Sequence, residues 1–207
     1  MKKGFTLVEM LVVIGIIIVL VGASVAAYGP VTRRAQKARG QELVTNTKDA
    51  LEFLLQKRNE WPLVIRKNAS GMDAEITSEV GASLARYGAM NLNYRKVESD
   101  GVEKYELVGL DQFGILTPWA AAVVKQRLAG GTVNDSTPVP SGGTIKDHRL
   151  RYAIDDDYDG RVKVGVSASG KQRATTVRAS ACVWCCGYDG KFGTSDDIYS
   201  WGRGQEE

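Results

Sequence analysis

A long apolar stretch dominates the N-terminal part of the chain. The 23 residues from Phe5 to Ala27 contain one charged side chain, that of Glu9. As a helix rising about 1.5 Å per residue they would extend roughly 34 Å, enough to cross a bilayer core of about 30 Å. A secretory signal peptide has a shorter apolar core, followed by a cleavage site of small residues. The pattern therefore predicts a single membrane-spanning helix.

The hydrophobic pattern becomes amphipathic beyond this stretch. Gly29-Pro30 can kink a helix without ending it. Between residues 31 and 58 the residues expected on the buried face recur at helical spacing: Leu43, Thr47, Ala50, Leu51 and Leu54. Pro62 marks the end, because the residue before a proline is pushed out of the helical region. We therefore predict one N-terminal helix with a membrane half (5–27) and an amphipathic half (28–60).

Residues 61–207 show shorter periodic segments, typical of a small globular head. A weak helical pattern covers 72–90, and a second helix begins after Thr117 with Pro118 in its first turn and stops at Gly130-Gly131. Strand patterns cover 105–110, 149–154, 161–166 and 175–184, and an Asp-rich turn predicts that the second and third form a hairpin. The predicted fold class is α+β, with the long helix packed on a small antiparallel-sheet head.

Charge and composition exclude several functions. The chain has 27 basic and 24 acidic residues, a formal net charge of +3, which is too balanced to indicate a nucleic-acid partner. The single histidine, His148, lies in a polar segment and is expected to be exposed. A lysine-containing, glycine-rich phosphate loop is missing. The chain is therefore not expected to be an enzyme.

Glu9 needs an explanation within the apolar stretch. A carboxylate in hydrocarbon costs roughly 3 kcal/mol on insertion scales and usually has a partner. One interpretation is an interfacial residue that reaches water and is favoured by the positive end of the helix dipole. The other is that cleavage between Gly4 and Phe5 creates an α-amine at Phe5, which is the counter-charge of Glu9 in the same chain or in a neighbouring one.

The residues Lys3-Gly4-Phe5-Thr6-Leu7-Val8-Glu9 resemble the class III signal of type IV pilins and type II secretion pseudopilins. The resemblance implies that a prepilin peptidase removes the leader 1–4 after Gly4 and methylates Phe5. It also implies that Glu9 pairs with the N-terminus of an adjacent subunit in a helical homo-oligomeric filament. The expected location is the inner membrane, crossed once, with the head 61–207 in the periplasm. The other partners implied are minor pseudopilins and an inner-membrane assembly platform with its ATPase.

A second motif lies near the C-terminus, in residues 186–201. Asp189-Gly190 is followed by Asp196-Asp197, and calcium takes six to eight oxygen ligands from carboxylates and carbonyls. On spacing alone, a solvated acidic turn is the simpler interpretation. The segment DGKFGTSDDIYSW is, however, similar to the C-terminal calcium loop of the major pseudopilin of type II secretion. That resemblance implies calcium held by the side chains of Asp189, Asp196 and Asp197 and by the carbonyls of Cys186 and Thr194.

A further acidic run, from Asp155 to Gly160, matches the opening of an EF-hand loop, D-x-D-x-D-G. The twelfth position is Val166, where that loop requires a bidentate glutamate. A charged hairpin tip is the favoured interpretation. A second calcium site at Asp155, Asp157 and Asp159 is the alternative.

The three cysteines are Cys182, Cys185 and Cys186. On a strand the side chains at 182 and 185 point to opposite faces, and a bond between the adjacent pair would be strained. A zinc site would lack a fourth ligand apart from the distant His148. Reduced, buried thiols are therefore predicted, with an intersubunit disulfide or a metal site as alternatives.

Together these features predict a structural subunit of a type II secretion pseudopilus. The resemblance covers residues 2–62 and about 175–201. A type IV pilus subunit shares the same N-terminus, but the calcium-type tail and the lack of a widely spaced C-terminal cysteine pair favour secretion. A membrane-tethered calcium-binding module that does not polymerise is the third hypothesis.

Overall fold

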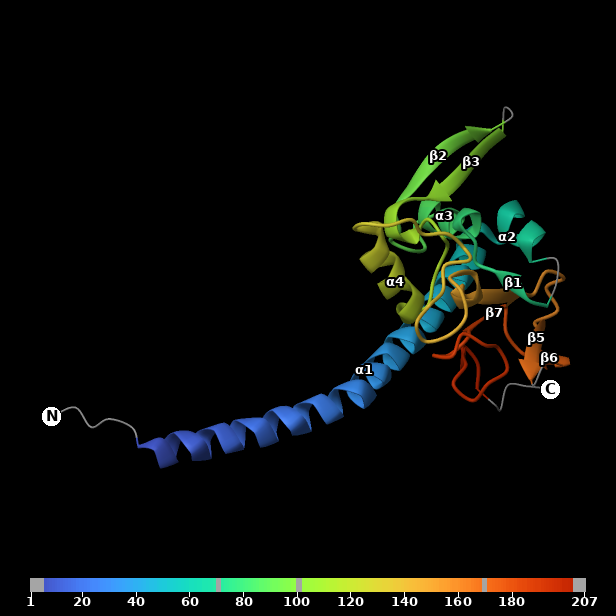
Figure 1. Ribbon diagram of the computed structural model, residues 1–207. Helices are drawn as coiled ribbons and strands as arrows, with labels where there is room; N and C mark the ends of the chain where they lie inside the picture. Colours follow the sequence, from blue (N-terminus) through green and yellow to red (C-terminus); the bar gives the residue numbers. More distant parts are fainter. Residues whose placement is uncertain (1–5, 70–71, 100–101, 169–170, 203–207) are drawn as a thin grey trace. The chain divides into compact units, whose positions relative to one another are not determined.

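The computed structural model describes residues 6–69, 72–99, 102–168 and 171–202 (Figure 1). The helices are α1 (Leu7–Arg58), α2 (Leu63–Asn68), α3 (Ser78–Arg86) and α4 (Pro118–Leu128), with short 3-10 turns at Gly109–Asp111 and Lys146–His148. The strands are β1 (Ala74–Glu75), β2 (Tyr94–Ser99), β3 (Val102–Leu107), β4 (Arg151–Ile154), β5 (Val162–Ala168), β6 (Lys171–Val177), β7 (Ala181–Cys185) and β8 (Ile198–Tyr199). The α+β prediction is confirmed.

The chain divides into two compact units, Met1–Gln36 and Lys37–Glu207. In the first unit α1 continues through Pro30 without ending, as predicted. The described side chains from Leu7 to Ser24 are all exposed. The helix is long and apolar enough, by length and composition, to cross a membrane.

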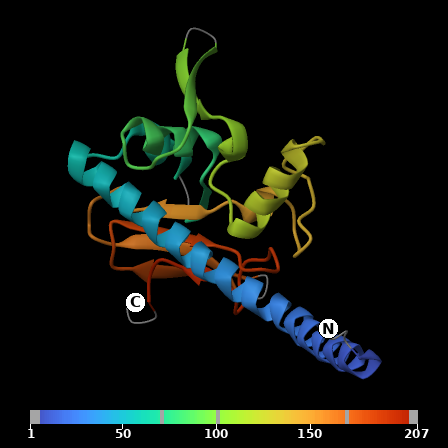
Figure 2. The same cartoon turned by 90° about the vertical axis from the view of Figure 1, so that its left-hand side faces the viewer.

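The second unit is built on an antiparallel sheet with strand order β1-β4-β7-β8. Tyr152 of β4 pairs with Val183 of β7, and both side chains are fully buried in the main core. The part of α1 beyond Lys37 crosses this sheet (Figure 2) and contributes Leu51 and Leu54 to the same core. Burying each of these leucines stabilises the head by roughly 2 kcal/mol. The predicted amphipathic packing of α1 is confirmed.

A second, smaller core lies on the other face of the sheet. Because side chains alternate along a strand, Cys182 and Trp184 of β7 face away from the main core. They pack against Val162, Val164 and Val177 of the β5–β6 hairpin. The C-terminal aromatic residues extend this cluster, with Trp201 edge-on to Trp184 at 5.7 Å between ring centroids.

The predicted hairpin of 149–154 with 161–166 is wrong. β4 pairs with β1 and β7, whereas β5 pairs with β6 in a separate two-stranded sheet. The predicted long strand 175–184 is also two strands, because a bend at 178–180 separates β6 from β7. Alternation identifies strands but not their partners, and β4 is buried enough to take an inner position in the larger sheet.

Two further segments differ from the prediction. The weak helix at 72–90 is confined to α3, since residues 74–75 form β1. The strand predicted at 105–110 ends at Leu107, because Gly109 has a φ of +71° and turns the chain. Its partner β2 was not predicted.

Candidate functional site

The predicted processing residues Gly4 and Phe5 lie outside the described residues. Glu9 is described, and it closes the first turn of α1. Its Oε2 accepts hydrogen bonds from the backbone N–H of Thr6 at 2.8 Å and from the Thr6 hydroxyl at 2.9 Å. The Thr6 hydroxyl oxygen in turn accepts the Glu9 N–H at 3.3 Å. This reciprocal arrangement is a capping box, whose T-x-x-E signature is present in the sequence but was not identified there.

The capping box gives Glu9 a third role beside the two predicted from sequence. Within one chain the carboxylate accepts the Thr6 N–H, one of the amides at a helix N-terminus that have no carbonyl partner in the helix. A neighbouring amine would therefore have to replace or share these contacts. The pairing of Glu9 with another subunit stays a prediction.

In the C-terminal loop, Asp196 and Asp197 both face main-chain amides. Asp196 Oδ2 accepts the N–H of Tyr188 at 2.6 Å, and Asp197 Oδ2 accepts the N–H of Gly193 at 2.6 Å. The Thr194 hydroxyl lies 2.5 Å from Asp196 Oδ1 and 3.1 Å from Asp197 Oδ1. The two carboxylates thus hold the loop in shape from within.

Asp189 is placed differently from these two residues. Its Oδ1 accepts the N–H of Lys191 at 2.9 Å, closing a local turn. Within the described residues, Asp189, Asp196 and Asp197 do not form a group whose carboxylate oxygens all lie within 4.8 Å. The structure therefore brings Asp196, Asp197 and Thr194 together and leaves Asp189 at the side of the loop.

The two loop carboxylates differ in their acidity. Burial raises the pKa of Asp197 above its ordinary value, despite the hydrogen bonds that it accepts. Burial acts on Asp196 in the same direction, but hydrogen bonds from Thr194 and from the Asp189 and Tyr188 amides outweigh it, so the pKa of Asp196 is lowered. None of the ion pairs formed within the described chain involves either carboxylate. The loop thus offers hard carboxylate oxygens without a cationic partner among these ion pairs, and each of those oxygens already accepts a hydrogen bond from within the loop.

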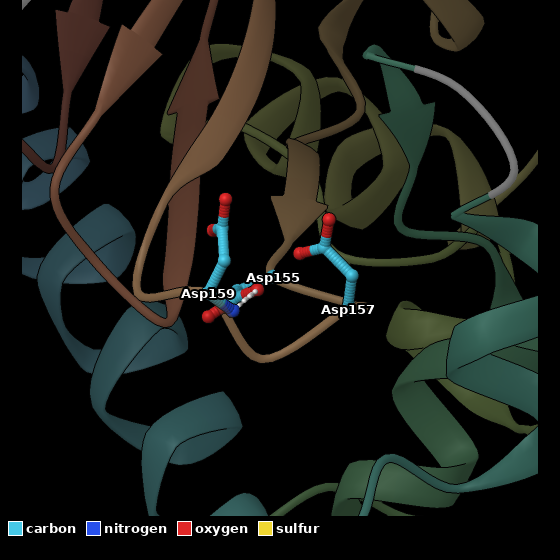
Figure 3. A group of neighbouring side chains, drawn as sticks. All are labelled: Asp155, Asp157 and Asp159. Carbon is cyan, nitrogen blue, oxygen red and sulfur yellow. Dashed lines mark hydrogen bonds between the residues drawn. The ribbon is translucent and has the colours of Figure 1, made fainter.

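The other acidic loop, between β4 and β5, does gather its carboxylates. Asp155, Asp157 and Asp159 offer oxygens that lie within 4.8 Å of one another (Figure 3). Asp155 is buried and accepts the N–H groups of Asp159 at 3.1 Å and Gly160 at 2.8 Å. Because β4 and β5 do not pair, this loop is not the predicted hairpin tip. Binding of an ion there stays a hypothesis.

His148 is fully buried, so the expectation of an exposed histidine is wrong. Its Nε2 lies 2.8 Å from the Gly142 carbonyl, and its Nδ1 lies 2.9 Å from the Thr117 hydroxyl. A carbonyl only accepts, so Nε2 carries the proton and Nδ1 accepts from Thr117. Burial lowers the pKa of His148, which favours this neutral form. Through these two hydrogen bonds His148 connects Thr117, at the start of α4, to the loop around Gly142.

All three cysteines are free and buried, as predicted. Cys182 and Cys185 lie in different cores on opposite faces of the sheet. Burial raises the pKa of each of these thiols to about 12. Burial also raises the pKa of Cys186, whose Sγ donates to the Asp147 carbonyl at 3.2 Å. These thiols are poor nucleophiles, and their positions indicate packing rather than redox chemistry.

Comparisons with known proteins found one matching family and two similar curated proteins. Residues 1–25 match the family described as "Prokaryotic N-terminal methylation motif". The chain is 36% identical over 62 residues to a "Fimbrial protein" of Neisseria meningitidis serogroup B and to one of serogroup A / serotype 4A. Each match covers 30% of this chain and 36% of the relative, so the chain spans about a third of the length of these curated relatives. No solved structure matches.

The motif, the relatives and the fold agree with one another. The methylation motif covers the segment in which Glu9 closes the first turn of α1. The long apolar helix leads into a head of small antiparallel sheets. The N-terminal motif, the similarity to fimbrial proteins over 62 residues and the α+β architecture together support a type IV pilin-like chain.

Proposed function

We propose that this chain is the structural subunit of a type II secretion pseudopilus, processed by prepilin peptidase and polymerised to drive protein export. The observation that carries the proposal is the apolar surface of α1, whose described side chains from Leu7 to Ser24 are all exposed. Such a surface must be covered by lipid before assembly and by the helices of neighbouring subunits after it. The subunit has no proposed catalytic role, and export would be driven by the assembly ATPase of the inner-membrane platform.

Processing is tested by the mass of the native protein. We expect the mature chain to begin at Phe5, carry one added methyl group on its α-amine and lack residues 1–4. A Gly4→Leu variant, in which the cleavage site is blocked, should retain the full N-terminus. Intact-protein and N-terminal peptide mass spectrometry distinguishes the two forms. A native chain that keeps its first four residues would contradict the mechanism.

A type IV pilus subunit is the second candidate, and the fimbrial relatives favour it. Those matches cover 62 residues, a length compatible with the N-terminal helix that both kinds of subunit share. The head supports secretion instead, through its Asp196-Asp197 loop and its free, buried cysteines. Deletion of the gene separates the two: loss of export with exoproteins retained in the periplasm supports a pseudopilus, whereas loss of surface fibres with normal export supports a pilus.

We also propose that the C-terminal loop binds calcium. Asp196 and Asp197 would supply carboxylate oxygens, and the carbonyls of Thr194 and Cys186 would add to them. The carboxylate of Asp189 would complete the ligands by turning away from the Lys191 N–H toward the ion. The support is a pair of partly buried acids without a cationic partner among the described ion pairs. The ion would neutralise that charge and stiffen a loop that has few apolar residues.

Calcium should stabilise the head against heat through this loop. At a free concentration of 100 times Kd, one ion adds about 2.7 kcal/mol, which raises Tm by roughly 5–10 °C for a chain of this size. Asp197→Asn keeps an acceptor for the Gly193 amide but removes the charge, so its calcium-dependent shift should largely vanish. Circular dichroism of the full chain in detergent, with calcium or a chelator, measures both.

The matched control is Asp157→Asn, which removes the same charge from the other acidic loop. It should retain the full calcium shift. If wild type and Asp197→Asn gain equally from calcium, the C-terminal loop does not bind it. If only Asp157→Asn loses the shift, the ion belongs to the loop between β4 and β5.

A further inference from the structure

A groove of about 610 Å³ lies in the head, away from the C-terminal loop. The end of α1, α2, α3 and β3 all contribute to its lining. Figure 1 shows α3 at the base of the β2–β3 hairpin and α2 beside it. Leu63 and Val102, which line the groove, expose 81% and 57% of their surface. The groove therefore offers apolar contacts as well as polar ones.

One edge of β3 lies along this groove. β2 and β3 form a two-stranded sheet, so β3 has no strand partner on its other side among the described residues. The Leu107 N–H points to that other side, where it donates to the Ser78 hydroxyl at 2.8 Å. Because N–H directions alternate along an antiparallel strand, the N–H groups of Tyr105 and Glu103 share this outer edge. Both residues line the groove.

The groove also carries cations that are held in place by tyrosines. The Arg86 guanidinium lies over the Tyr105 ring at 4.1 Å and over the Tyr87 ring at 5.6 Å. Stacking on a ring face fixes a guanidinium while leaving its N–H edge available for a carboxylate. Arg66 and Lys67 of α2 add two exposed cations. Within the described chain, none of these three cations forms an ion pair with a carboxylate.

The groove is lined by both acidic and basic side chains, and this mixture indicates which kind of ligand it can bind. Glu60, Glu79 and Glu103 also line the groove, and each has a cationic partner of its own. A nucleic acid, with uniform negative charge along its backbone, would be repelled by these acids. An extended polypeptide can place its carboxylates beside the unpaired cations and its apolar side chains against Leu63 and Val102. It can also donate and accept hydrogen bonds along β3.

We propose that this groove binds an extended, acidic segment of another polypeptide, which adds to β3 as a third strand. Main-chain hydrogen bonds at Glu103 and Tyr105 hold the backbone of the segment, as in other cases of strand addition. Arg86, Arg66 and Lys67 select its acidic side chains. The added strand also stabilises the β2–β3 hairpin, since a two-stranded sheet by itself is marginal. The site does not depend on the calcium loop or on filament assembly.

The probe is a fluorescent peptide of alternating sequence, (Glu-Val)₄, added to the full chain in detergent micelles. We expect saturable binding by fluorescence anisotropy. Replacing both Arg66 and Lys67 with serine should weaken it roughly fivefold, the effect of losing two exposed charge pairs. The matched control replaces Lys125 and Arg127 of α4 with serine, which removes the same charge outside the groove and should leave binding unchanged.

Strand addition is tested by two backbone changes. Glu103→Pro removes the outward N–H and should weaken binding severalfold, whereas Glu103→Ala keeps that N–H and should bind at least as well as wild type. A peptide N-methylated at alternate residues should also lose affinity for the unmodified protein. Equal weakening by both serine pairs would show non-specific charge attraction and overturn the proposal. Absence of binding, or preferential binding of an oligothymidine of equal length, would also overturn it.

Discussion

Replacing Glu9 with leucine is expected to abolish filament assembly while leaving membrane insertion and processing intact. Removing the charge makes insertion easier by roughly 3 kcal/mol, so the subunit should still reach the membrane. The variant lacks the carboxylate that would neutralise the α-amine of Phe5 on a neighbouring subunit. Without that pairing an uncompensated amine would be buried among apolar helices. Membrane fractionation measures insertion, N-terminal mass spectrometry measures processing, and electron microscopy of sheared filaments measures assembly.

A Thr6→Val variant separates this role from helix capping. It removes the hydroxyl that donates to Glu9 Oε2 but keeps the Glu9 carboxylate and the backbone N–H of residue 6. Loss of part of a cap costs about 1 kcal/mol, which a helix of 52 residues can absorb. Filaments should therefore still form. Equal loss of assembly in both variants would mean that Glu9 acts through the first turn of its own helix, and normal filaments from Glu9→Leu would remove its assembly role altogether.

The long helix was predictable because its signal is local and repeated. Leu51 and Leu54 fall on a period that only a helix satisfies, and burial of that face follows from the same period. The start of α4 was predictable too, since Pro118 fits the first helical position. The side chain of Thr117 was not: it bonds to His148 instead of capping the helix.

Features that depend on distant partners were not predictable in the same way. The segments 149–154 and 161–166 both alternate as strands should, yet the nearest strand in sequence is not the partner of either one. His148 lies in a polar segment, and its burial arises only because a carbonyl and a hydroxyl from elsewhere in the head satisfy both ring nitrogens. The Thr6–Glu9 capping box, in contrast, was predictable from the T-x-x-E spacing, because both of its partners lie in one helical turn.

A substitution of Gly190 is expected to lower the stability of the head strongly, because the C-terminal loop crosses the loop around Gly142 at this residue. A Cβ at Gly190 would lie 2.5 Å from the Gly142 carbonyl oxygen and 2.9 Å from His148 Nε2. That carbonyl is the acceptor of the His148 N–H, so an added methyl group displaces both sides of a buried hydrogen bond. Gly190 also has a φ of +68°, which costs a residue with a side chain about 1–2 kcal/mol. Gly190→Ala should therefore destabilise the head by roughly 3–4 kcal/mol.

Gly109→Ala is the control, because Gly109 has nearly the same φ, +71°, and no atom within 4 Å of the added Cβ. It should cost only the backbone strain of about 1–2 kcal/mol. Urea unfolding of the two variants is measured in chelator, so that calcium does not contribute. The difference between their free energies of unfolding gives the steric cost of the added Cβ where the two loops cross. Since Tyr188 of the same loop packs edge-on to Trp119 at 6.1 Å, a change in tryptophan emission confined to Gly190→Ala would show that the loop has moved. Equal losses of stability in both variants would instead mean that the two loops separate without cost, and that the His148 hydrogen bond does not hold the C-terminal loop in place.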